Sequence, residues 1–172
     1  MMDSHLQSLT RIMILIIGLN LTVHAGGEQP APANVQAALF TKLLGMNKNF
    51  DGKSITIYVV GASDFAGEMK KAVGKKSGAA TIASVDEGNG VPGTAPNVIY
   101  VADEQQAGDI MNYCAENKVL SITGNPGLVG KGITLGVGVA GGKPKVLLNA
   151  GASKKEGISW NPAILKIASK VD

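Results

Sequence analysis

The apolar residues of this chain fall into short continuous runs, separated by stretches with helical spacing. Three runs, Ser54–Val60, Asn97–Ala102 and Val119–Thr123, have the length and the Val/Ile content of strands buried on both faces. Between them, residues 65–75 and 103–116 place apolar side chains on one side of a helix. Strands that alternate with helices in this way predict parallel βαβ units.

The pattern changes after Gly124–Gly127. Two further β-runs, Gly132–Val139 and Lys145–Asn149, are joined by Ala140–Pro144, whose glycines and proline are typical of a hairpin turn. A weaker strand is expected at Ala79–Val85. The chain therefore predicts a single-domain α/β fold, with a mixed, mostly parallel sheet flanked by helices and a β-hairpin near the C-terminus. No second domain or internal repeat is evident in its 172 residues.

Helices are expected at both ends of this domain. Asn34 can cap the first, whose apolar stripe runs from Val35 to Leu44. The last follows Trp160, where Asn161 suits the N-cap and Pro162 the first helical turn. Its apolar face comprises Ile164, Leu165, Ile167 and Ala168. These positions predict a C-terminal helix docked on the core.

The first 25 residues have the three parts of a secretory signal peptide. Arg11 supplies a positive region, Ile12–Val23 an apolar run, and Val23-His24-Ala25 the small residues of a cleavage site. The run is shorter than the roughly 20 apolar residues of a membrane-spanning helix, although retention by an N-terminal anchor is the alternative. Residues 26–33, rich in Gly, Pro and Ala, predict a flexible linker before a domain over 34–172. We expect an exported, periplasmic protein.

Export removes the two histidines, His5 and His24, from the mature chain. This excludes histidine-based catalytic triads, histidine-ligated metal sites and histidine pH switches. Asp86 and Glu87 lie together in an expected loop, where such pairs are ordinarily solvated, so no acid/base pair stands out. The residues single out no catalytic or metal-binding set and imply no cofactor.

Cys114 is the only cysteine and lies within the expected helix over 103–116. Without a partner it cannot form an internal disulfide. The simplest interpretation is a small buried hydrophobe. An intermolecular bridge or a redox-sensing thiol is the alternative.

Charge and glycine motifs argue against nucleic acids and nucleotides as partners. The formal net charge is only +3, and no arginine follows Arg11. Gly136–Gly141 matches G-x-G-x-x-G, but a helix-breaking Gly-Lys-Pro and then a strand follow it, instead of a helix N-terminus. Gly124–Gly132 resembles a phosphate-binding loop, but its glycine spacing is too long and it lacks the Ser/Thr that would hold magnesium.

One candidate binding site lies where the parallel strands end, because open α/β sheets usually bind ligands at the carboxyl edge of their strands. Ser63, Asp64 and Phe65 follow the first of the three strands, and the loops around Asp103 and Asn125 follow the other two. These five residues predict a shallow pocket, with the exposed Lys154 and Lys155 as rim contacts. The simpler alternative is that Ser63 or Asp64 only caps a helix and Phe65 is its first core residue.

Several segments, taken in order, resemble the YfiR-like family of periplasmic proteins. They are VQAALFTKLLGM, ITIYVVGASDFAGEM, NVIYVAD, VLSITGNPGLVGKGITL and KVLLNAGASKKEGISWNPAILKIAS. The resemblance spans Val35 to Val171, and the last segment is its most specific part.

This resemblance implies a non-enzymatic regulatory domain with helices packed on a mixed sheet. Studied members restrain a membrane-bound diguanylate cyclase by binding its periplasmic region, which lowers cyclic di-GMP signalling, and other relatives accompany sensor kinases. The expected partner is therefore a membrane signalling protein, and a homodimer is left open. Members under redox control carry paired cysteines, whereas Cys114 has no partner here. A periplasmic small-molecule binding protein that uses the same loop edge is the alternative function.

Overall fold

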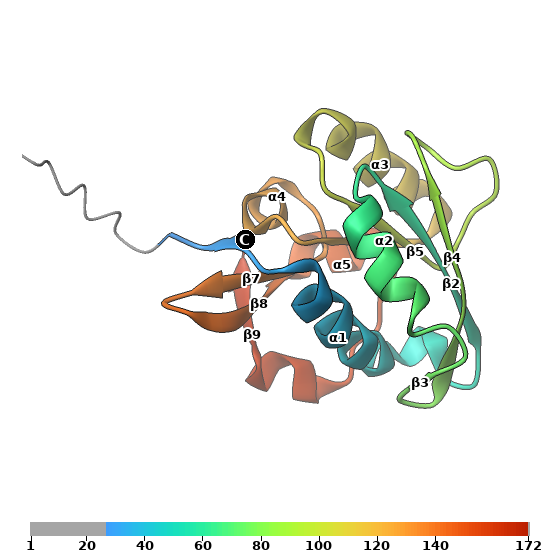
Figure 1. Ribbon diagram of the computed structural model, residues 1–172, viewed down its shortest axis with the longest axis horizontal. Coiled ribbons are helices and arrows are strands. Elements are labelled where there is room, and N and C mark those ends of the chain that lie inside the picture. Colours follow the sequence, from blue (N-terminus) through green and yellow to red (C-terminus); the bar gives the residue numbers. More distant parts are fainter. Residues whose placement is uncertain (1–26, 172) are drawn as a thin grey trace, which may run out of the picture.

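The computed structural model describes residues 27–171, which form a central nine-stranded sheet (Figure 1). The strands are β1 (Gln29–Pro30), β2 (Ser54–Val60), β3 (Lys76–Ser77), β4 (Ala80–Gly88), β5 (Val98–Val101), β6 (Leu120–Thr123), β7 (Leu135–Ala140), β8 (Lys143–Asn149) and β9 (Ala168–Val171). The helices are α1 (Ala33–Leu43), α2 (Ser63–Lys70), α3 (Glu104–Asn117), α4 (Pro126–Lys131) and α5 (Ala150–Lys155). Short 3₁₀ helices span Leu44–Met46, Lys48–Phe50 and Pro162–Lys166.

The sheet is mixed and mostly parallel, as the sequence predicts. Its order is β3-β4-β2-β5-β6-β7-β8-β9, with β1 paired to β7. Strands β4, β2, β5, β6 and β7 run parallel to one another, and β9 runs parallel to β8. The predicted hairpin is β7–β8, whose antiparallel register pairs Leu135 with Leu148 and Ala140 with Lys143. Because β8 runs against β7, its carboxyl end lies at the opposite edge of the sheet from the carboxyl ends of β2, β5 and β6.

Helices cover both faces of the sheet. Helices α1 and α2 pack on one face, in front of the strands in Figure 1, and α3 packs on the other. The larger core centres on an aromatic cluster in which Phe65 stacks on Tyr100 at 3.8 Å between ring centroids, and Phe40 meets both rings edge to face. Such aromatic pairs add to the stabilisation that burial of apolar area provides.

The C-terminal segment differs from the predicted docked helix. Asn161 does cap a helix, accepting a hydrogen bond from the Ala163 amide at 3.0 Å, but this is the 3₁₀ helix Pro162–Lys166. The chain then becomes strand β9, parallel to β8. Strand β9 satisfies the backbone groups along β8, which a helix there would leave unpaired. Consequently Ile164 is buried, whereas Leu165 and Ile167 are each 51% exposed.

The predicted linker over 26–33 is also more ordered than expected. Gln29–Pro30 forms β1 on β7, and Ala31 is 5% exposed. Gly138 permits this close approach, because a Cβ there would lie 2.9 Å from the Gln29 carbonyl oxygen. Helix α1 begins at Ala33 with Pro32 at the N-cap, so Asn34 is not the cap. The predicted signal peptide, residues 1–25, lies outside the described residues.

Helix α2 is shorter than the predicted helix over 65–75. It ends at Lys70, and the chain then turns so that the Gly74 amide donates to the Ile82 carbonyl at 2.8 Å. Gly74 has φ +82°, a backbone conformation that glycine adopts without strain. Val73, expected in the core, is therefore 42% exposed. Strand β4, in turn, continues to Gly88, three residues beyond its predicted end.

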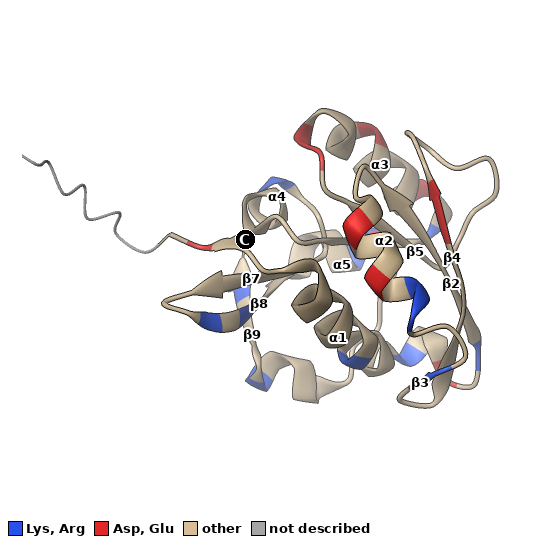
Figure 2. Cartoon of the chain, in the orientation of Figure 1, with Lys and Arg blue, Asp and Glu red and all other residues tan. Residues whose placement is uncertain are grey.

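Charged side chains are unevenly distributed over the surface. Acidic residues gather where α2 and α3 begin, and lysines surround the opposite end of α2 and the turn before β9 (Figure 2). Among residues 27–171, no helix combines the length and the apolar character that a bilayer crossing requires.

Candidate functional site

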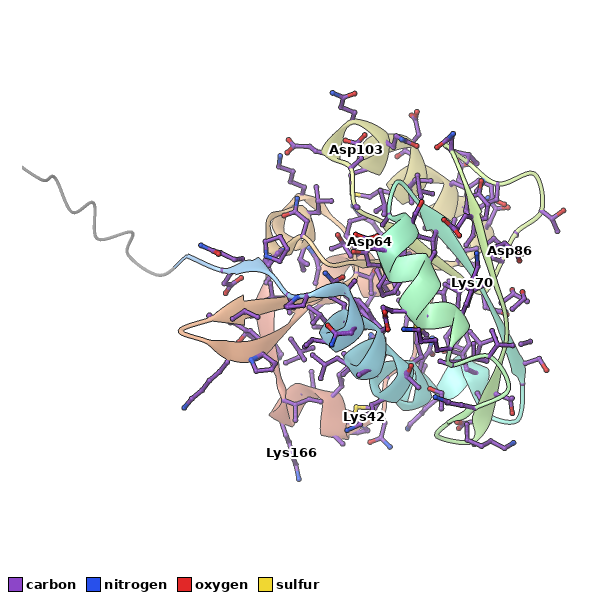
Figure 3. All side chains as sticks on the ribbon, viewed as in Figure 1. Lys42, Asp64, Lys70, Asp86, Asp103 and Lys166 are labelled. Atoms are coloured by element: carbon purple, nitrogen blue, oxygen red, sulfur yellow. The ribbon has the colours of Figure 1, made fainter. Side chains whose placement is uncertain are left out.

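The five predicted loop-edge residues do lie at one edge of the sheet. Ser63 and Asp64 follow β2, Asp103 follows β5 and Asn125 follows β6, and these three strands are parallel neighbours. Figure 3 shows Asp64 and Asp103 at the same end of the molecule. Ser63 and Asp64 are exposed in the first turn of α2, whose N-cap is Ala62 without a side-chain hydrogen bond. Neither residue is therefore the helix cap that the sequence suggested.

The other three residues are engaged in the fold. Asp103 caps α3 by accepting from the Gln105 amide at 2.8 Å, and Asn125 caps α4 by accepting from the Gly127 amide at 3.1 Å. Phe65 is 2% exposed and stacks in the aromatic core. These contacts leave Phe65 and the two capping oxygens little capacity to bind a ligand.

A buried polar pair fills the space beneath this edge. The Tyr100 hydroxyl donates to Gln36 Oε1 at 2.8 Å, and Gln36 Nε2 donates to the Ala31 carbonyl at 2.6 Å. Gln36 packs so closely on Gly124 that a Cβ there would lie 2.0 Å from its Oε1. Burial raises the pKa of Tyr100 to about 12, so this hydroxyl stays protonated. Beneath the loop edge the structure thus places the buried side chain of Gln36, whose role the helical pattern alone could not reveal.

Lys154 and Lys155 do not border the loop edge. They lie on α5, which follows β8, and β8 ends at the opposite edge of the sheet because it is antiparallel to β7. Each lysine lines a different cavity at that opposite edge. The predicted grouping of these lysines with Asp64 and Asp103 is therefore wrong.

The larger of these cavities is an open groove formed by the last third of the chain, which we call the C-terminal groove. Its volume is about 440 Å³. It is lined by Leu148, Ala150, Ser153, Lys154, Ile158, Trp160, Asn161, Pro162, Leu165 and Lys170. Its lining is mainly apolar, and the only charged side chains among these residues are lysines.

Backbone contacts with the segment after α1 hold the groove wall in place. Trp160 forms an isolated antiparallel bridge with Asn47, and the amide of Asn161 donates to the Met46 carbonyl at 2.7 Å. The indole Nε1 of Trp160 donates to Ser153 Oγ at 3.0 Å, which ties the wall to α5. The only tryptophan of the chain is thus fixed between two elements, and its ring borders the groove.

The surroundings of the groove favour contact with another molecule. Strand β9 is the end strand of the sheet, so its outer edge has no partner strand among the described residues. Leu165 and Ile167 are exposed just before it. An open strand edge beside exposed apolar side chains is a typical template for an added strand or a docked peptide.

A buried carboxyl group lies at the C-terminal end of α5, on Glu156, a residue that the sequence analysis did not single out. Glu156 is 2% exposed. Its Oε2 accepts from the Ser121 amide at 3.0 Å and from Thr134 Oγ1 at 2.6 Å, and its Oε1 accepts from Ser121 Oγ. Burial raises the pKa of Glu156 to about 7, although these three hydrogen bonds oppose the rise. A carboxyl group with this pKa changes its charge near neutral pH.

A second cavity of about 260 Å³ lies beside Glu156, between α3, the end of α4 and α5. Lys131 and Lys155 line it together with Asn112, Asn149, Met111 and Glu156. Lys131 forms an ion pair with Glu104, and Asn149 uses its amide to donate to the Val129 carbonyl and its oxygen to accept from the Ala152 amide. The cavity therefore brings polar groups next to the buried carboxyl without any cation in direct contact with it.

Cys114 faces the same region from α3. It is fully buried, and burial together with the negative charge of Glu156 raises the pKa of its thiol. A thiol without solvent access and with a raised pKa is a poor nucleophile and a poor redox sensor. The structure agrees with a small buried hydrophobe and not with a redox thiol. In the described part of the chain, no group of three or more His, Cys, Asp or Glu side chains could hold a metal ion.

Comparison with protein families matches residues 38–169 to the YfiR/HmsC-like family. The chain belongs to the YfiR/HmsC-like family. Among solved structures, it is similar to a conserved domain protein of Vibrio cholerae O1 biovar El Tor, with a TM-score of 0.57 at 13% sequence identity. The similarity covers 84% of this chain and 61% of that chain, so the present chain corresponds to only part of the other protein. Comparison with curated proteins gives no match.

The structural similarity shows the fold alone, because the identity is low. The family match agrees with the resemblance carried by the sequence segments from Val35 to Val171. Membership of the YfiR/HmsC-like family supports a regulatory role in outline. The partner and the contact surface have to be argued from the grooves and charges of this chain.

Proposed function

We propose that this YfiR/HmsC-like chain is an exported, non-enzymatic regulator that binds the periplasmic part of a membrane signalling protein through its C-terminal groove. The observation that carries the proposal is the groove itself, which joins an apolar cavity to an open strand edge. The partner segment would be extended, would add its backbone to β9 and would place an apolar side chain beside Trp160.

The positive charge around the groove indicates which side chains the partner segment would carry. Lys154 and Lys170 line the groove, and Lys166 is exposed in the adjoining turn, at the opposite end of the molecule from Asp103 (Figure 3). A segment with acidic residues flanking its apolar side chains would complement these lysines. Charged rims of this kind mainly increase association rates and exclude wrong partners, while buried apolar anchors supply most of the affinity.

Regulation would follow from unequal binding to two states of the partner. The domain can shift the partner's equilibrium only by the difference in its affinity for those states. No turnover is needed for this role, and a diguanylate cyclase or a sensor kinase would both be suitable partners.

Crosslinking from the groove tests this proposal. A photoreactive amino acid at Leu165 should capture one membrane protein in envelope preparations, and Leu165→Asp should reduce co-purification of that protein at least about tenfold. Val73→Asp is the matched control. Val73 is also an exposed apolar residue, but it lies just after α2 and does not line the groove. Equal loss in both variants, or no specific product from position 165, would contradict the groove as the contact surface.

A small-molecule ligand is the second candidate, favoured by the cavity volume of about 440 Å³ in the C-terminal groove. Ligand pockets commonly lie between about 300 and 1,000 Å³. A ligand present at 100 times its dissociation constant would raise the free energy of unfolding by about 2.7 kcal/mol. A thermal-shift screen that finds such a compound, with loss of the shift in Trp160→Ala, would favour this function over a protein partner.

A further inference from the structure

Both ends of the sheet are open. The strand order places β9 at one end and β4, with the short β3, at the other (Figure 1). Strand β3 covers only the start of β4, where Lys76 pairs with Thr81 and Ser77 with Ala80. Over residues 84–88, the outer edge of β4 therefore has no partner strand in the described part of the chain. Unpaired strand edges of this kind are templates for another strand.

The two open edges carry charges of opposite sign. Asp86 and Glu87 are exposed on β4, whereas Lys170 is exposed on β9 and Lys166 in the 3₁₀ helix before it. Figure 3 shows Asp86 and Lys166 at opposite ends of the molecule. Within residues 27–171, Asp86 and the two lysines form no ion pair, and Glu87 forms an exposed one with Lys70. Exposed ion pairs contribute little to stability, so these side chains are available to another molecule.

These charges distinguish the ways in which the edges of two copies could pair. Two β9 edges would bring Lys166 and Lys170 of both copies together, and two β4 edges would do the same with Asp86 and Glu87. Like charges directly opposite one another destabilise a strand pair, whereas opposite charges stabilise it. Only the pairing of β9 in one copy with β4 in the next brings opposite charges together.

The strand directions also suit this pairing. Strand β4 is parallel to β7, β8 is antiparallel to β7, and β9 is parallel to β8, so β9 and β4 run in opposite directions. A second copy placed beside the first, without turning its sheet over, would thus form an antiparallel β9–β4 pair. Lys170 is paired with Leu148, which faces the core under α1, and Glu87 reaches Lys70 of α2 on that same face. The faces therefore allow Lys170 of one copy to lie opposite Glu87 of the next.

Exposed apolar side chains lie next to both edges. Leu165 and Ile167 are each 51% exposed before β9, and Val91 is 44% exposed after β4. In an antiparallel pair, the segment before β9 meets the segment after β4, so the contact brings these three side chains toward one another. Removing them from water would stabilise the contact. Lys75 and Lys76 lie beside the start of β4, away from the lysines of β9.

We propose that copies of this chain associate head to tail, with β9 of one copy paired to the acidic edge of β4 in the next. Residues 84–91 have the chemistry expected of the partner segment, since acidic residues there precede an exposed apolar one. A second copy would therefore cover the C-terminal groove and exclude the membrane signalling protein from it. This masking rests on the proposed function, whereas the association itself does not. A head-to-tail contact leaves one open edge at each end of the assembly.

Charge reversal in the full chain tests the association. Sedimentation equilibrium over roughly 10 µM to 1 mM should show association of the wild type. Glu87→Lys and Lys170→Glu should each raise its dissociation constant at least about tenfold. Asp64→Lys and Lys42→Glu are the matched controls, because these exposed charges lie on α2 and α1 and should change the constant less than about twofold. Asp86→Lys repeats the test without disturbing the ion pair with α2, in case Glu87→Lys does not fold.

A mixture of the two reversed variants distinguishes the head-to-tail contact from a symmetric dimer. The Glu87→Lys copy keeps its basic β9, and the Lys170→Glu copy keeps its acidic β4, so these two edges can pair. The two reversed edges also carry opposite charges. The mixture should therefore associate within about threefold of the wild type, although each variant alone does not. A monomeric wild type, a mixture without association, or an equal loss in the controls would overturn the head-to-tail contact.

Crosslinking from position 165 separates this association from the proposed function. In the purified full chain, a photoreactive amino acid there should form a product with residues 84–91 of a second copy. In envelope preparations, Glu87→Lys should increase the yield of the captured membrane protein at least about twofold, because Glu87 does not line the groove and its reversal frees the groove of other copies.

The possible results assign any failure to one proposal or the other. A product between two copies without a captured membrane protein would uphold the association and count against the proposed function. A captured membrane protein without a product between copies would do the reverse. If both products form but Glu87→Lys leaves the yield of the membrane protein unchanged, the association does not mask the groove.

Discussion

The two edges of the sheet differ in how their polar groups are used. At the carboxyl edge of the parallel strands, an oxygen of Asp103 and an oxygen of Asn125 each cap a helix, and the buried Gln36 packs against Gly124. At the opposite edge, apolar side chains remain exposed beside Trp160, and Glu156 is buried next to a cavity. Polar residues at a favoured binding edge are therefore weak evidence of a site until their hydrogen bonds are known.

The largest expected effect is on stability, and it tests whether Phe65 is a core residue or a contact for a ligand at the loop edge. Phe65→Ala should lower the free energy of unfolding by about 3–5 kcal/mol, because it removes the ring that stacks on Tyr100 and leaves a cavity. Urea denaturation followed by circular dichroism measures this. Leu165→Ala is the control and should change stability by less than about 0.5 kcal/mol, since Leu165 is exposed. Similar small losses in both would place Phe65 outside the core.

A somewhat smaller effect should appear as a pH dependence of stability. The pKa of Glu156 is about 7 in the folded protein and near 4.5 in an unfolded chain, so the folded state binds more protons between these values. Its contribution to stability is complete below about pH 4.5 and is lost as pH rises through 7. At about 1.4 kcal/mol per pKa unit, the loss amounts to roughly 3 kcal/mol.

The difference between wild type and Glu156→Gln isolates this contribution from other carboxyl groups. Glu87, for example, has a lowered pKa because it bonds to Lys70, so it acts in the opposite direction at acidic pH. Urea midpoints measured from about pH 5 to 8 should fall for the wild type relative to the variant. A constant difference across that range would show that Glu156 is already ionised throughout.

The smallest expected effects concern the two caps at the carboxyl edge. Asp103→Ala and Asn125→Ala should each cost about 1 kcal/mol, because each leaves a helix N-terminal amide without its acceptor. Ser63→Ala, which removes no cap, should cost less than about 0.5 kcal/mol. Partner capture from position 165 should be unchanged in all three. If any of these three variants no longer captured the partner, the carboxyl edge would be a contact surface after all.

Much of the fold could be predicted because buried strands appear in the sequence as short apolar runs, and turns appear as clusters of glycine and proline. The apolar runs at Ser54–Val60 and Val119–Thr123 became β2 and the region of β6, and the Gly-rich turn after β7 became a hairpin. The capping residue Asn161 could be found from the sequence because a cap interacts with a backbone amide only two residues away, whereas Asp103 was predicted to begin its helix but not to cap it.

The C-terminal strand could not be predicted in this way. Ile164, Leu165, Ile167 and Ala168 have the spacing of a helix face, yet the segment pairs with β8. Ala168 pairs with Val146, 22 residues earlier in the chain, so the edge of β8 that this segment covers is not local to it. Backbone groups along that edge would otherwise be unpaired, and pairing them stabilises a strand more than a weak helical pattern stabilises a helix.

The residue pattern alone thus established an α/β domain of the YfiR/HmsC-like type, the alternation along the chain of its parallel strands with helices, and the absence of histidine after residue 24. The position of the candidate site depended on contacts between distant segments. Glu156 meets Thr134 and Ser121, 22 and 35 residues away, and the reversal of β8 carries Lys154 to the edge opposite Asp103. The local spacing of apolar residues indicates which side chains are buried. The direction of a strand and the hydrogen-bond partners of a buried ionisable group depend instead on how the whole chain packs.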